Sequence, residues 1–405
     1  MSKARVIAAL IFEQIALQRT SHSINMNVRQ QQAKAVVPAA PSTRYTGEAS
    51  RHSTPVKSHL EEEPIWNPES QFPAPVAVLQ LVTGRWVSNI VGLAAELGLA
   101  DLIQTGPKTA EEVAAANGLH APSLHRFLRA LASVGIFAEQ ADGRFGQTPM
   151  SDALRSNVPH SMRGLARFAT RPWTTRAWME LEHSLRTGAS AFEHVHGMQV
   201  FDYLTQHPIE MEIFADAMGS VTSQIGVAVA QAYDFSSLGV LADIGGSHGM
   251  ILAIVLARHP ALRGILFDLP TVVGGASTVL RTHGVEDRVE ITAGNFFETV
   301  PQGADAYLLK HILHDWGDSD SERILKRVHA ASNPGAKLLV VESIVESPNE
   351  PQFAKITDIE MLVQTHSGRE RTRSEWQKLL SAGGFRFLRA VPTRSSVHVI
   401  EALRD

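Results

Sequence analysis

The sequence predicts a helical region with a winged-helix layout, followed by a larger α/β domain built on a parallel sheet with helices on both faces. From residue 75 to about 150, apolar residues recur every three or four positions and then give way to a short hairpin pattern. From residue 238 onward, apolar runs of strand length alternate with helical stretches, which is the pattern of a parallel sheet. The length of 405 residues leaves room for two or three such units.

Composition excludes several classes of protein. Hydrophobic residues make up 44% of the chain, which is enough for a sizeable core. The net charge of -4 gives no general attraction to nucleic acid or to an anionic membrane. The chain has no cysteine, which excludes disulfides, thiol nucleophiles and thiolate metal sites. Because no apolar run approaches the roughly 20 residues of a spanning helix, we expect a cytoplasmic protein with no membrane and no nucleic-acid partner.

Residues 1–70 have the composition of an extension and linker. The first 60 residues contain eight Lys or Arg and two Asp or Glu. This basic, acid-poor composition is typical of a transit peptide, but a disordered extension, or a start at Met26, accounts for it equally well. An acidic, proline-containing stretch follows, so ordered structure is expected to begin near Pro75.

Residues 71–160 are predicted to hold three helices and a hairpin. The first helix stops at Gly98, and Thr109 with Glu112 three positions later forms a capping box at the start of the second. The third helix opens near residue 121, and the hairpin occupies 136–145. Winged helices often bind DNA, but two isolated arginines do not make a basic face. Dimerisation through the apolar helical face is therefore the expected use of this region.

Residues 161–405 begin with helices over 160–235 and continue as strands alternating with helices. Strands are expected at 240–244, 264–267, 289–292, 306–309 and 337–341, with helices at 250–259, 272–283 and 318–332. Parallel sheets bind ligands at the carboxyl ends of their strands. Functional residues are therefore expected just after each strand.

The first strand is followed by Asp-Ile-Gly-Gly-Ser-His-Gly at 243–249, a loop whose glycines let a ligand approach the backbone closely. The loop lacks the dinucleotide spacing, because the required glycine positions counted from Gly245 hold Ser247 and Met250. Asp268 ends the second strand and could accept both hydroxyls of a ribose. The pattern favours a nucleoside with an exposed ribose and an ammonium group, although a strand-end cap is an alternative role for either acid.

A second cluster, Leu-Lys-His-Ile-Leu-His-Asp-Trp at 309–316, follows a later strand. Two histidines three residues apart beside an aspartate could suggest a metal, but no HExxH helix accompanies them, and the acids that follow fit a helix N-terminus. A histidine in a strand-end loop is more simply a general base, since its pKa lies near neutrality. We therefore predict no metal at this site.

Together these motifs resemble the catalytic domain of O-methyltransferases of the plant caffeic acid type and their bacterial relatives, which include acetylserotonin, hydroxyneurosporene and polyketide O-methyltransferases. The matching segments are LADIGGSHG at 241–249, FDLP at 267–270, AGNFFETVP at 293–301, LLKHILHDW at 308–316, LLVVES at 338–343 and GRERTRSEW at 368–376. The region 75–150 is similar to the dimerisation domain of that family. The resemblance implies a Rossmann-like domain dependent on S-adenosyl-L-methionine (SAM), a winged-helix dimerisation domain, and a homodimer.

The resemblance also implies a role for each site residue. On the cofactor side, Gly245 and Gly246 would hold the methionine part of SAM, Asp268 the ribose, Asn295 and Phe296 the adenine, and Lys310 would contact the cofactor at the strand end. On the acceptor side, His314 would take the proton of the substrate hydroxyl, with Glu342 and Glu370 flanking and orienting it, Asp315 beside it, and Met361 clamping the substrate ring.

These roles imply methyl transfer to a hydroxyl of a small, aromatic molecule (a phenol or polyketide), with S-adenosyl-L-homocysteine as product. A neutral histidine held by carboxylates suits such a reaction, although Glu370 lies among arginines and could instead be a solvated charge. Two departures concern the cofactor: Ser247 replaces a third glycine and Asn295 an aspartate. The alternatives are a SAM-binding enzyme with another reaction, such as hydroxylation or decarboxylation, and a winged-helix regulator. A flat apolar guest is suggested by Phe168, Trp173, Phe192, Met218 and Met361.

Overall fold

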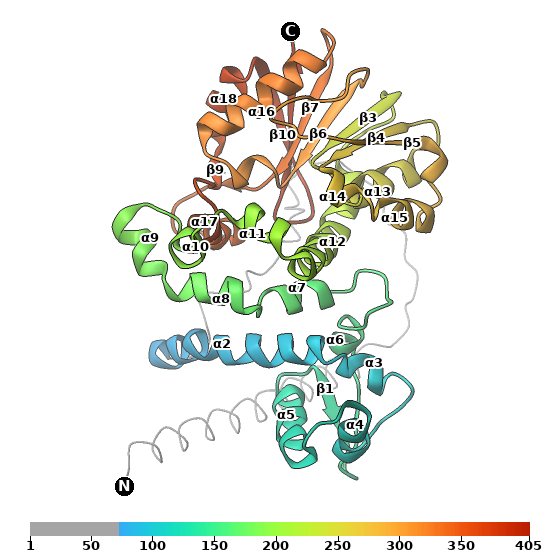
Figure 1. The fold of residues 1–405 in the computed structure, drawn as a ribbon, viewed down its shortest axis with the longest axis vertical. Coiled ribbons are helices and arrows are strands. Elements are labelled where there is room, and N and C mark those ends of the chain that lie inside the picture. The colour runs from blue at the N-terminus through green and yellow to red at the C-terminus, as the bar shows by residue number, and fades with distance from the viewer. Residues whose placement is uncertain (1–72) are drawn as a thin grey trace, which may run out of the picture. The chain divides into compact units, whose positions relative to one another are not determined.

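The computed structural model describes residues 73–405. Its N-terminal part consists of four helices and a hairpin (Figure 1). The interpretation of residues 1–70 lies outside the described residues. The elements are α2 (Ala74–Glu96), α3 (Leu99–Ile103), α4 (Ala110–Asn117), α5 (Ala121–Ser133), β1 (Phe137–Glu139) and β2 (Phe145–Gln147). The three expected helices and the hairpin are thus confirmed, and α3 is an additional short helix.

Local signals explain where these helices begin and end. Thr109 and Glu112 form the expected capping box of α4, in which each side chain accepts a hydrogen bond from the backbone of the other residue. Gly98 and Gly118 follow α2 and α4 with φ angles of 62° and 64°, which glycine adopts without the penalty of a side chain.

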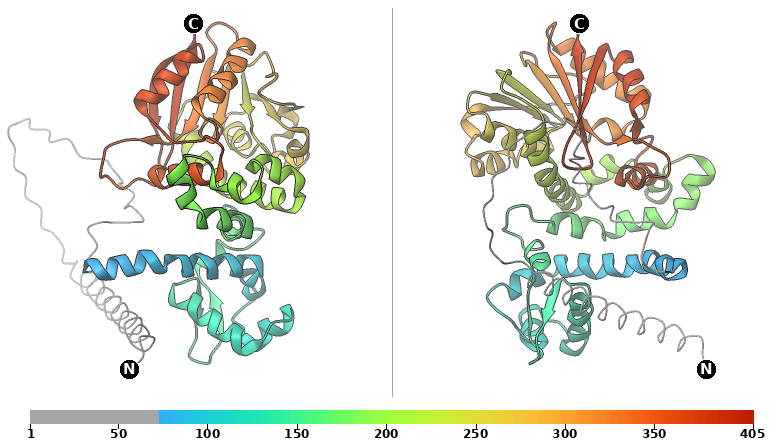
Figure 2. Two further views of the ribbon diagram at one scale, coloured as in Figure 1. Left: turned by 60° about the vertical axis from the view of Figure 1, so that its left-hand side comes forward. Right: turned by 180° about the vertical axis from the view of Figure 1, so that it is seen from behind.

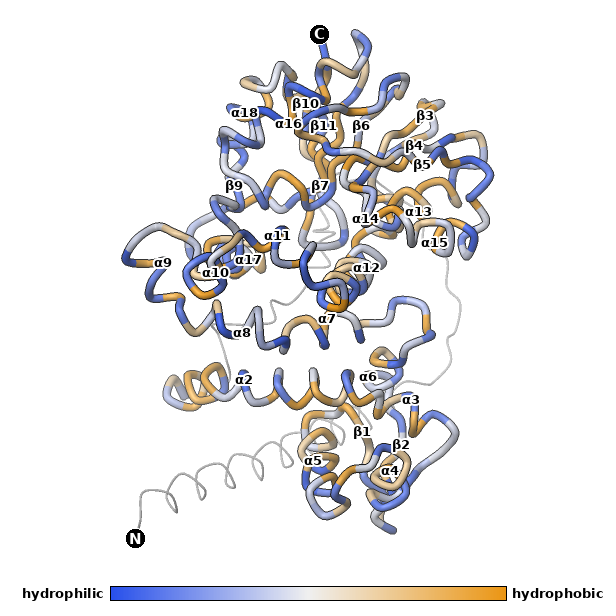
Figure 3. The backbone as a smooth tube through the Cα atoms, in the orientation of Figure 1, coloured by the Kyte–Doolittle hydropathy of each residue, from blue (hydrophilic) through white to orange (hydrophobic). Residues whose placement is uncertain are grey.

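Helix α2 buries little of its apolar surface. Of its 23 residues, Gly92, Ala94 and Ala95 are buried. Hydrophobic residues nevertheless occur along the whole length of α2 (Figure 3). Its exposed large apolar side chains are Val78, Leu81, Val82, Trp86, Val87 and Leu93. By length and composition alone, α2 and α12 (Pro208–Ala232) could cross a membrane, but α12 is more than half buried, as expected of a core helix.

A layer of helices connects this part to the sheet. It comprises α6 (Pro149–Asp152), α7 (Arg163–Phe168), α8 (Pro172–Met179), α9 (Leu181–Thr187), α10 (Ala191–His196), α11 (Val200–Gln206) and α12. Aromatic side chains form a core of their own here, in which the rings of Trp173 and Phe192 meet edge to face with their centroids 5.9 Å apart. Trp173 and Phe192, which were expected to suit a flat apolar guest, are both buried in this core.

The central sheet has seven strands in the order β10-β11-β7-β6-β3-β4-β5. Figure 2 shows the sheet from two further sides. The strands are β3 (Val240–Ile244), β4 (Arg263–Asp268), β5 (Val289–Ala293), β6 (Ala306–Lys310), β7 (Lys337–Glu342), β10 (Phe385–Pro392) and β11 (His398–Arg404). Strands β3 to β7 are parallel, as predicted. The C-terminal pair was not predicted: β11 runs antiparallel to β7, and β10 antiparallel to β11. The sheet is therefore mixed rather than parallel throughout.

Helices cover both faces of the sheet. One core contains buried residues of α12, α13 (Met250–Arg258) and α15 (Ala276–Thr282). The other contains residues of α16 (Asp318–Ala331) and α18 (Arg373–Ala382). The helix expected over 272–283 is split into α14 (Pro270–Val273) and α15. The break falls at Gly274 and Gly275, where a β-carbon on Gly275 would lie 2.7 Å from the ring of His248.

Candidate active site

The glycine loop after β3 packs too closely to admit side chains. A β-carbon on Gly246 would lie 2.4 Å from a carboxylate oxygen of Asp243, and one on Gly245 would lie 2.5 Å from Ile312. Ser247 has a φ of 52°, in the region that favours glycine. Its amide donates a hydrogen bond of 2.7 Å to Asp268, so the acid at the end of β4 fastens the loop. The short distances leave the backbone of the loop as its binding surface.

Two ionisable side chains, the buried Asp243 and the partly buried Lys310, lie near this loop and interact electrostatically. Neither carboxylate oxygen of Asp243 has a hydrogen-bond partner among the described residues. Burial raises the pKa of Asp243 to about 7, although the charge of Lys310 acts against this rise. Burial also lowers the pKa of Lys310, whose Nζ lies 3.4 Å from Nδ1 of His311. An orphaned buried carboxylate under a glycine cradle fits a ligand that carries an ammonium group.

His314 lies at the centre of three carboxylates. It belongs to a single 3-10 turn, η2 (Leu313–Asp315), directly after β6. Its Nδ1 lies 2.9 Å from Oε1 of Glu370 and 3.6 Å from Oε2 of Glu342, and its Nε2 lies 3.5 Å from Oδ1 of Asp315. Glu342 is 0% and Glu370 4% exposed. The interpretation of Glu370 as a solvated charge among arginines is therefore wrong.

The carboxylates also determine the charge of the imidazole. Burial lowers the pKa of His314, but the three surrounding carboxylates outweigh it and raise the pKa to about 10. In turn, burial raises the pKa of Glu342 to about 7 and that of Asp315 to about 6. The expected neutral imidazole is thus not the favoured form of the ligand-free protein, because the carboxylates stabilise the imidazolium. His311, stacked on His314 with ring centroids 5.0 Å apart, stays neutral because burial lowers its pKa well below the usual value.

Backbone contacts hold both glutamates in place. Oε1 of Glu342 accepts hydrogen bonds from the amides of Ile312 and Leu313, at 3.0 and 3.1 Å. The amide of Glu370 donates to Asp358 on α17 (Phe353–Gln364). The two acids adjoin a pair of short parallel strands, β8 (Ile344–Val345) and β9 (Arg371–Thr372).

Arg371 is a site residue that the sequence analysis missed. It is fully buried and donates hydrogen bonds of 2.8 Å to the carbonyls of Leu313 and Trp316, on either side of His314. It also donates at 2.9 Å to Asp318. The signal was its place directly before the capping box that begins at Thr372, but an arginine among other arginines resembles a solvated side chain. Arg371 fixes the turn that carries His314.

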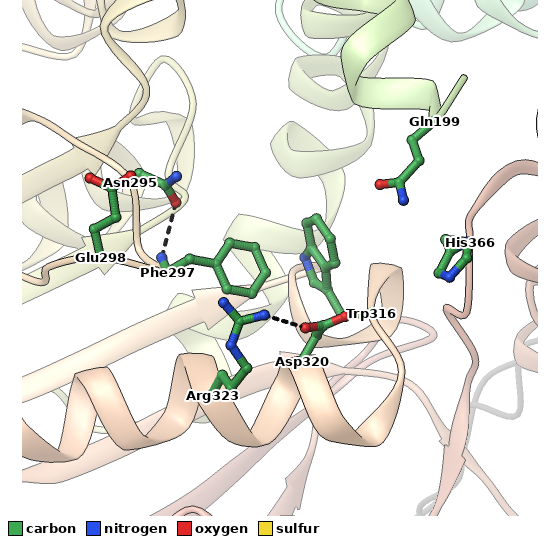
Figure 4. Close-up of a pocket in the computed structure, with 8 residues that line it drawn as sticks. All are labelled: Gln199, Asn295, Phe297, Glu298, Trp316, Asp320, Arg323 and His366. Atoms are coloured by element: carbon green, nitrogen blue, oxygen red, sulfur yellow. Dashed lines mark hydrogen bonds and ion pairs between the residues drawn. The ribbon is translucent and has the colours of Figure 1, made fainter. Parts of the chain in front are cut away.

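The expected adenine contacts, Asn295 and Phe296, lie after β5. Asn295 Oδ1 accepts a hydrogen bond of 3.0 Å from the amide of Phe297, and the ring of Phe296 meets Trp316 edge to face. A cavity of about 380 Å³ opens beside Asn295 (Figure 4). It is lined by Gln199, Asn295, Phe297, Glu298, Trp316, Asp320, Arg323 and His366. The cavity is therefore lined by Asn295 but not by His314.

The fold and the two clusters match a known class of enzyme. A family model described as the O-methyltransferase domain matches residues 178–386, and a model of the O-methyltransferase dimerisation domain matches residues 79–157. The chain belongs to this family and is a SAM-dependent O-methyltransferase.

Its relatives include proteins of bacterial and human origin. A phenazine O-methyltransferase of Lysobacter antibioticus is 41% identical over 83% of this chain and 98% of its own length. An 8-amino-8-demethylriboflavin N,N-dimethyltransferase of Streptomyces davaonensis is 35% identical over 84% of this chain and 98% of its own length. The structure of human N-acetylserotonin methyltransferase in complex with SAM superimposes with a TM-score of 0.76 at 28% identity, covering 83% of this chain and 99% of the human one.

Proposed function

We propose that this enzyme transfers the methyl group of SAM to a hydroxyl of a small aromatic acceptor, with His314 as the general base. The observation that carries the proposal is the contact of His314 Nδ1 with two buried glutamates, at 2.9 and 3.6 Å. This arrangement turns Nδ1 toward Glu342 and Glu370 and leaves Nε2 as the nitrogen that accepts the proton. An aromatic acceptor is supported by the name of the phenazine O-methyltransferase relative, because phenazine is a fused aromatic ring system.

On the cofactor side, the glycine loop fits the methionine part of SAM. Gly245 and Gly246 would hold it, above the buried carboxylate of Asp243, which has no partner among the described residues. Asp268 would bind the ribose hydroxyls, and Asn295 and Phe296 would contact the adenine. Lys310 would contact the cofactor at the end of β6. When bound, SAM supplies a methyl group already activated by its sulfonium, and S-adenosyl-L-homocysteine is the product.

The protein's own task is to position the acceptor and take its proton. A phenol titrates near pH 10, so a base is needed at neutral pH. His314 first has to lose the proton that its carboxylates favour in the ligand-free protein. A positive charge bound at the strand ends lowers the pKa of a nearby imidazolium. The carboxylates then stabilise the imidazolium that forms when His314 accepts the acceptor's proton. In-line positioning of acceptor and methyl supplies a further share of the rate, up to about 7–11 kcal/mol.

Replacing His314 with glutamine tests the proposal. Turnover should fall by about 10²–10⁴ because the base is lost, while calorimetry should show that the affinity for SAM is not weakened. His120→Gln is the control, since His120 Nδ1 also lies 2.9 Å from a side-chain oxygen, that of Ser123, but the residue is exposed and belongs to the N-terminal helical part. Turnover that is equal in the two variants would contradict the role of His314.

The test also separates the alternatives. When the enzyme is incubated with methyl-labelled SAM and a panel of phenols, we expect the label to appear in a methylated product. SAM binding without transfer would favour a regulator or a different SAM-dependent reaction. We further propose that residues 71–160 form the dimerisation domain and residues 161–405 the helical connector and catalytic domain of a homodimer, because α2 exposes six large apolar side chains. A cytoplasmic location remains a prediction.

A further inference from the structure

We propose that His314, Glu342 and Glu370 also form a binding site for zinc or a similar divalent transition-metal ion, which inhibits the enzyme. The ion would take the place of the proton between the imidazole and the two glutamates. Metal binding at this site is separate from catalysis, because the proposed methyl transfer requires no metal.

The spacing of the three side chains suits a tetrahedral ion. One ligand atom from each of the three lies within 4.8 Å of the other two. Zinc bonds to nitrogen and oxygen are about 2.0–2.2 Å long, so ligand atoms around a tetrahedral zinc lie about 3.4 Å apart. The distances from Nδ1 to the two glutamates, 2.9 and 3.6 Å, bracket that value. Small side-chain shifts would therefore complete three of the four positions.

The glutamates keep oxygens available for an ion. Oε2 of Glu342 and Oε2 of Glu370 are buried and have no hydrogen-bond partner in the part of the chain that the structure describes. Glu342 is held through its other oxygen by two backbone amides, so Oε2 can bind an ion without loss of that anchor. Two carboxylates also balance the charge of a divalent ion, which offsets the cost of burying it.

The donor set selects the kind of metal. One imidazole nitrogen and two carboxylates suit zinc or cobalt, whereas magnesium and calcium prefer all-oxygen sites. The chain contains no cysteine, so no thiolate competes for the ion.

Inhibition follows from the chemistry of imidazole. A neutral imidazole bound to a metal through Nδ1 carries its hydrogen on Nε2, so it has no lone pair left for a substrate proton. The inhibition therefore rests on the proposed function of His314, whereas the binding of the metal does not.

Binding can be measured without turnover. Cobalt chloride is titrated into the full-length, metal-free protein, and the visible absorption of tetrahedral cobalt is recorded; zinc chloride is titrated in parallel by calorimetry. We expect one ion per chain at this site, and binding weakened at least about tenfold in Glu342→Gln and Glu370→Gln. Circular dichroism checks that the variants are folded.

Two controls locate the ion. Asp315→Asn should retain the cobalt spectrum, because Asp315 faces Nε2, and His366→Gln should retain it because the exposed His366–Glu193 pair is a different site. The absence of a tetrahedral cobalt spectrum, or a spectrum that persists in both glutamine variants, would overturn the proposed site. Stoichiometric binding with undiminished turnover would support the site but contradict His314 as the base, so the two proposals fail separately.

Discussion

Replacing Arg371 with methionine should destabilise the protein and release the turn that carries His314. Methionine fills much of the same space but donates no hydrogen bond. In the native protein, Arg371 is fully buried, and its guanidinium donates to the carbonyls of Leu313 and Trp316, which the hydroxyl of Ser321 also contacts at 3.1 Å. The substitution leaves both carbonyls without this donor, inside the protein.

The cost follows from these contacts. A buried polar group left unsatisfied costs about 1–3 kcal/mol, and the single hydroxyl hydrogen of Ser321 can still satisfy one of the two carbonyls. The lost ion pair with Asp318 adds little, since the side chain of that residue is 63% exposed. We expect a loss of about 2 kcal/mol in the free energy of unfolding. Turnover should fall as well, because His314 lies between the two carbonyls in the sequence.

Urea unfolding followed by circular dichroism measures the stability, and turnover is measured at saturating SAM. Arg369→Met is the matched control: Arg369 is exposed and pairs with Glu375 on the surface, so its loss should cost less than about 1 kcal/mol. If the two variants unfold at the same urea concentration with equal slopes, Arg371 does not hold the turn as described.

Three further predictions concern the cofactor, the base and the dimer. Asp268→Ala should weaken SAM binding at least about tenfold, because Asp268 both fits the ribose and fastens the loop through Ser247; unchanged affinity in calorimetry would count against it. The rate at saturating SAM should rise with pH through neutrality, because the raised pKa of His314 keeps it protonated at low pH; a rate that falls over this range would contradict the base. Leu81→Glu on the exposed face of α2 should convert a dimer to monomers in light scattering, and a dimer of unchanged mass would exclude that face as the contact.

Local signals in the sequence predicted most of the fold. The capping box at Thr109, the glycine stops and the alternation of strands with helices after residue 238 all act over a few residues. The C-terminal strands were not predicted, because the position of β11 beside β7 depends on pairing between strands that are distant in the sequence. The break at Gly275 depends on the approach of His248 from another segment. Such contacts leave no periodic pattern in the chain.

The site was predictable to a different extent on its two sides. A strand-end position sufficed to single out His314 as a candidate base, whereas Glu342 and Glu370 came from the resemblance to a family. Their negative charges, together with that of the adjacent Asp315, reverse the charge expected of His314. Glu342 and Glu370 reach the imidazole from segments that are distant in the sequence. Arg371 was missed for the same reason: the carbonyls that it satisfies lie more than 50 residues earlier in the chain.

The short parallel pair of β8 and β9 has a consequence for engineering. Ile344 pairs with Arg371 and Val345 with Thr372, so the chain between them leaves and returns at the same place. Glu342 lies just before this closure and Glu370 at its end, whereas α17, with Met361, lies within it. The segment from 346 to 369 is therefore a natural cassette. Exchanging it for the equivalent piece of a relative should change which acceptors the enzyme takes, as long as the new piece keeps an acid at the position of Asp358, which anchors the amide of Glu370.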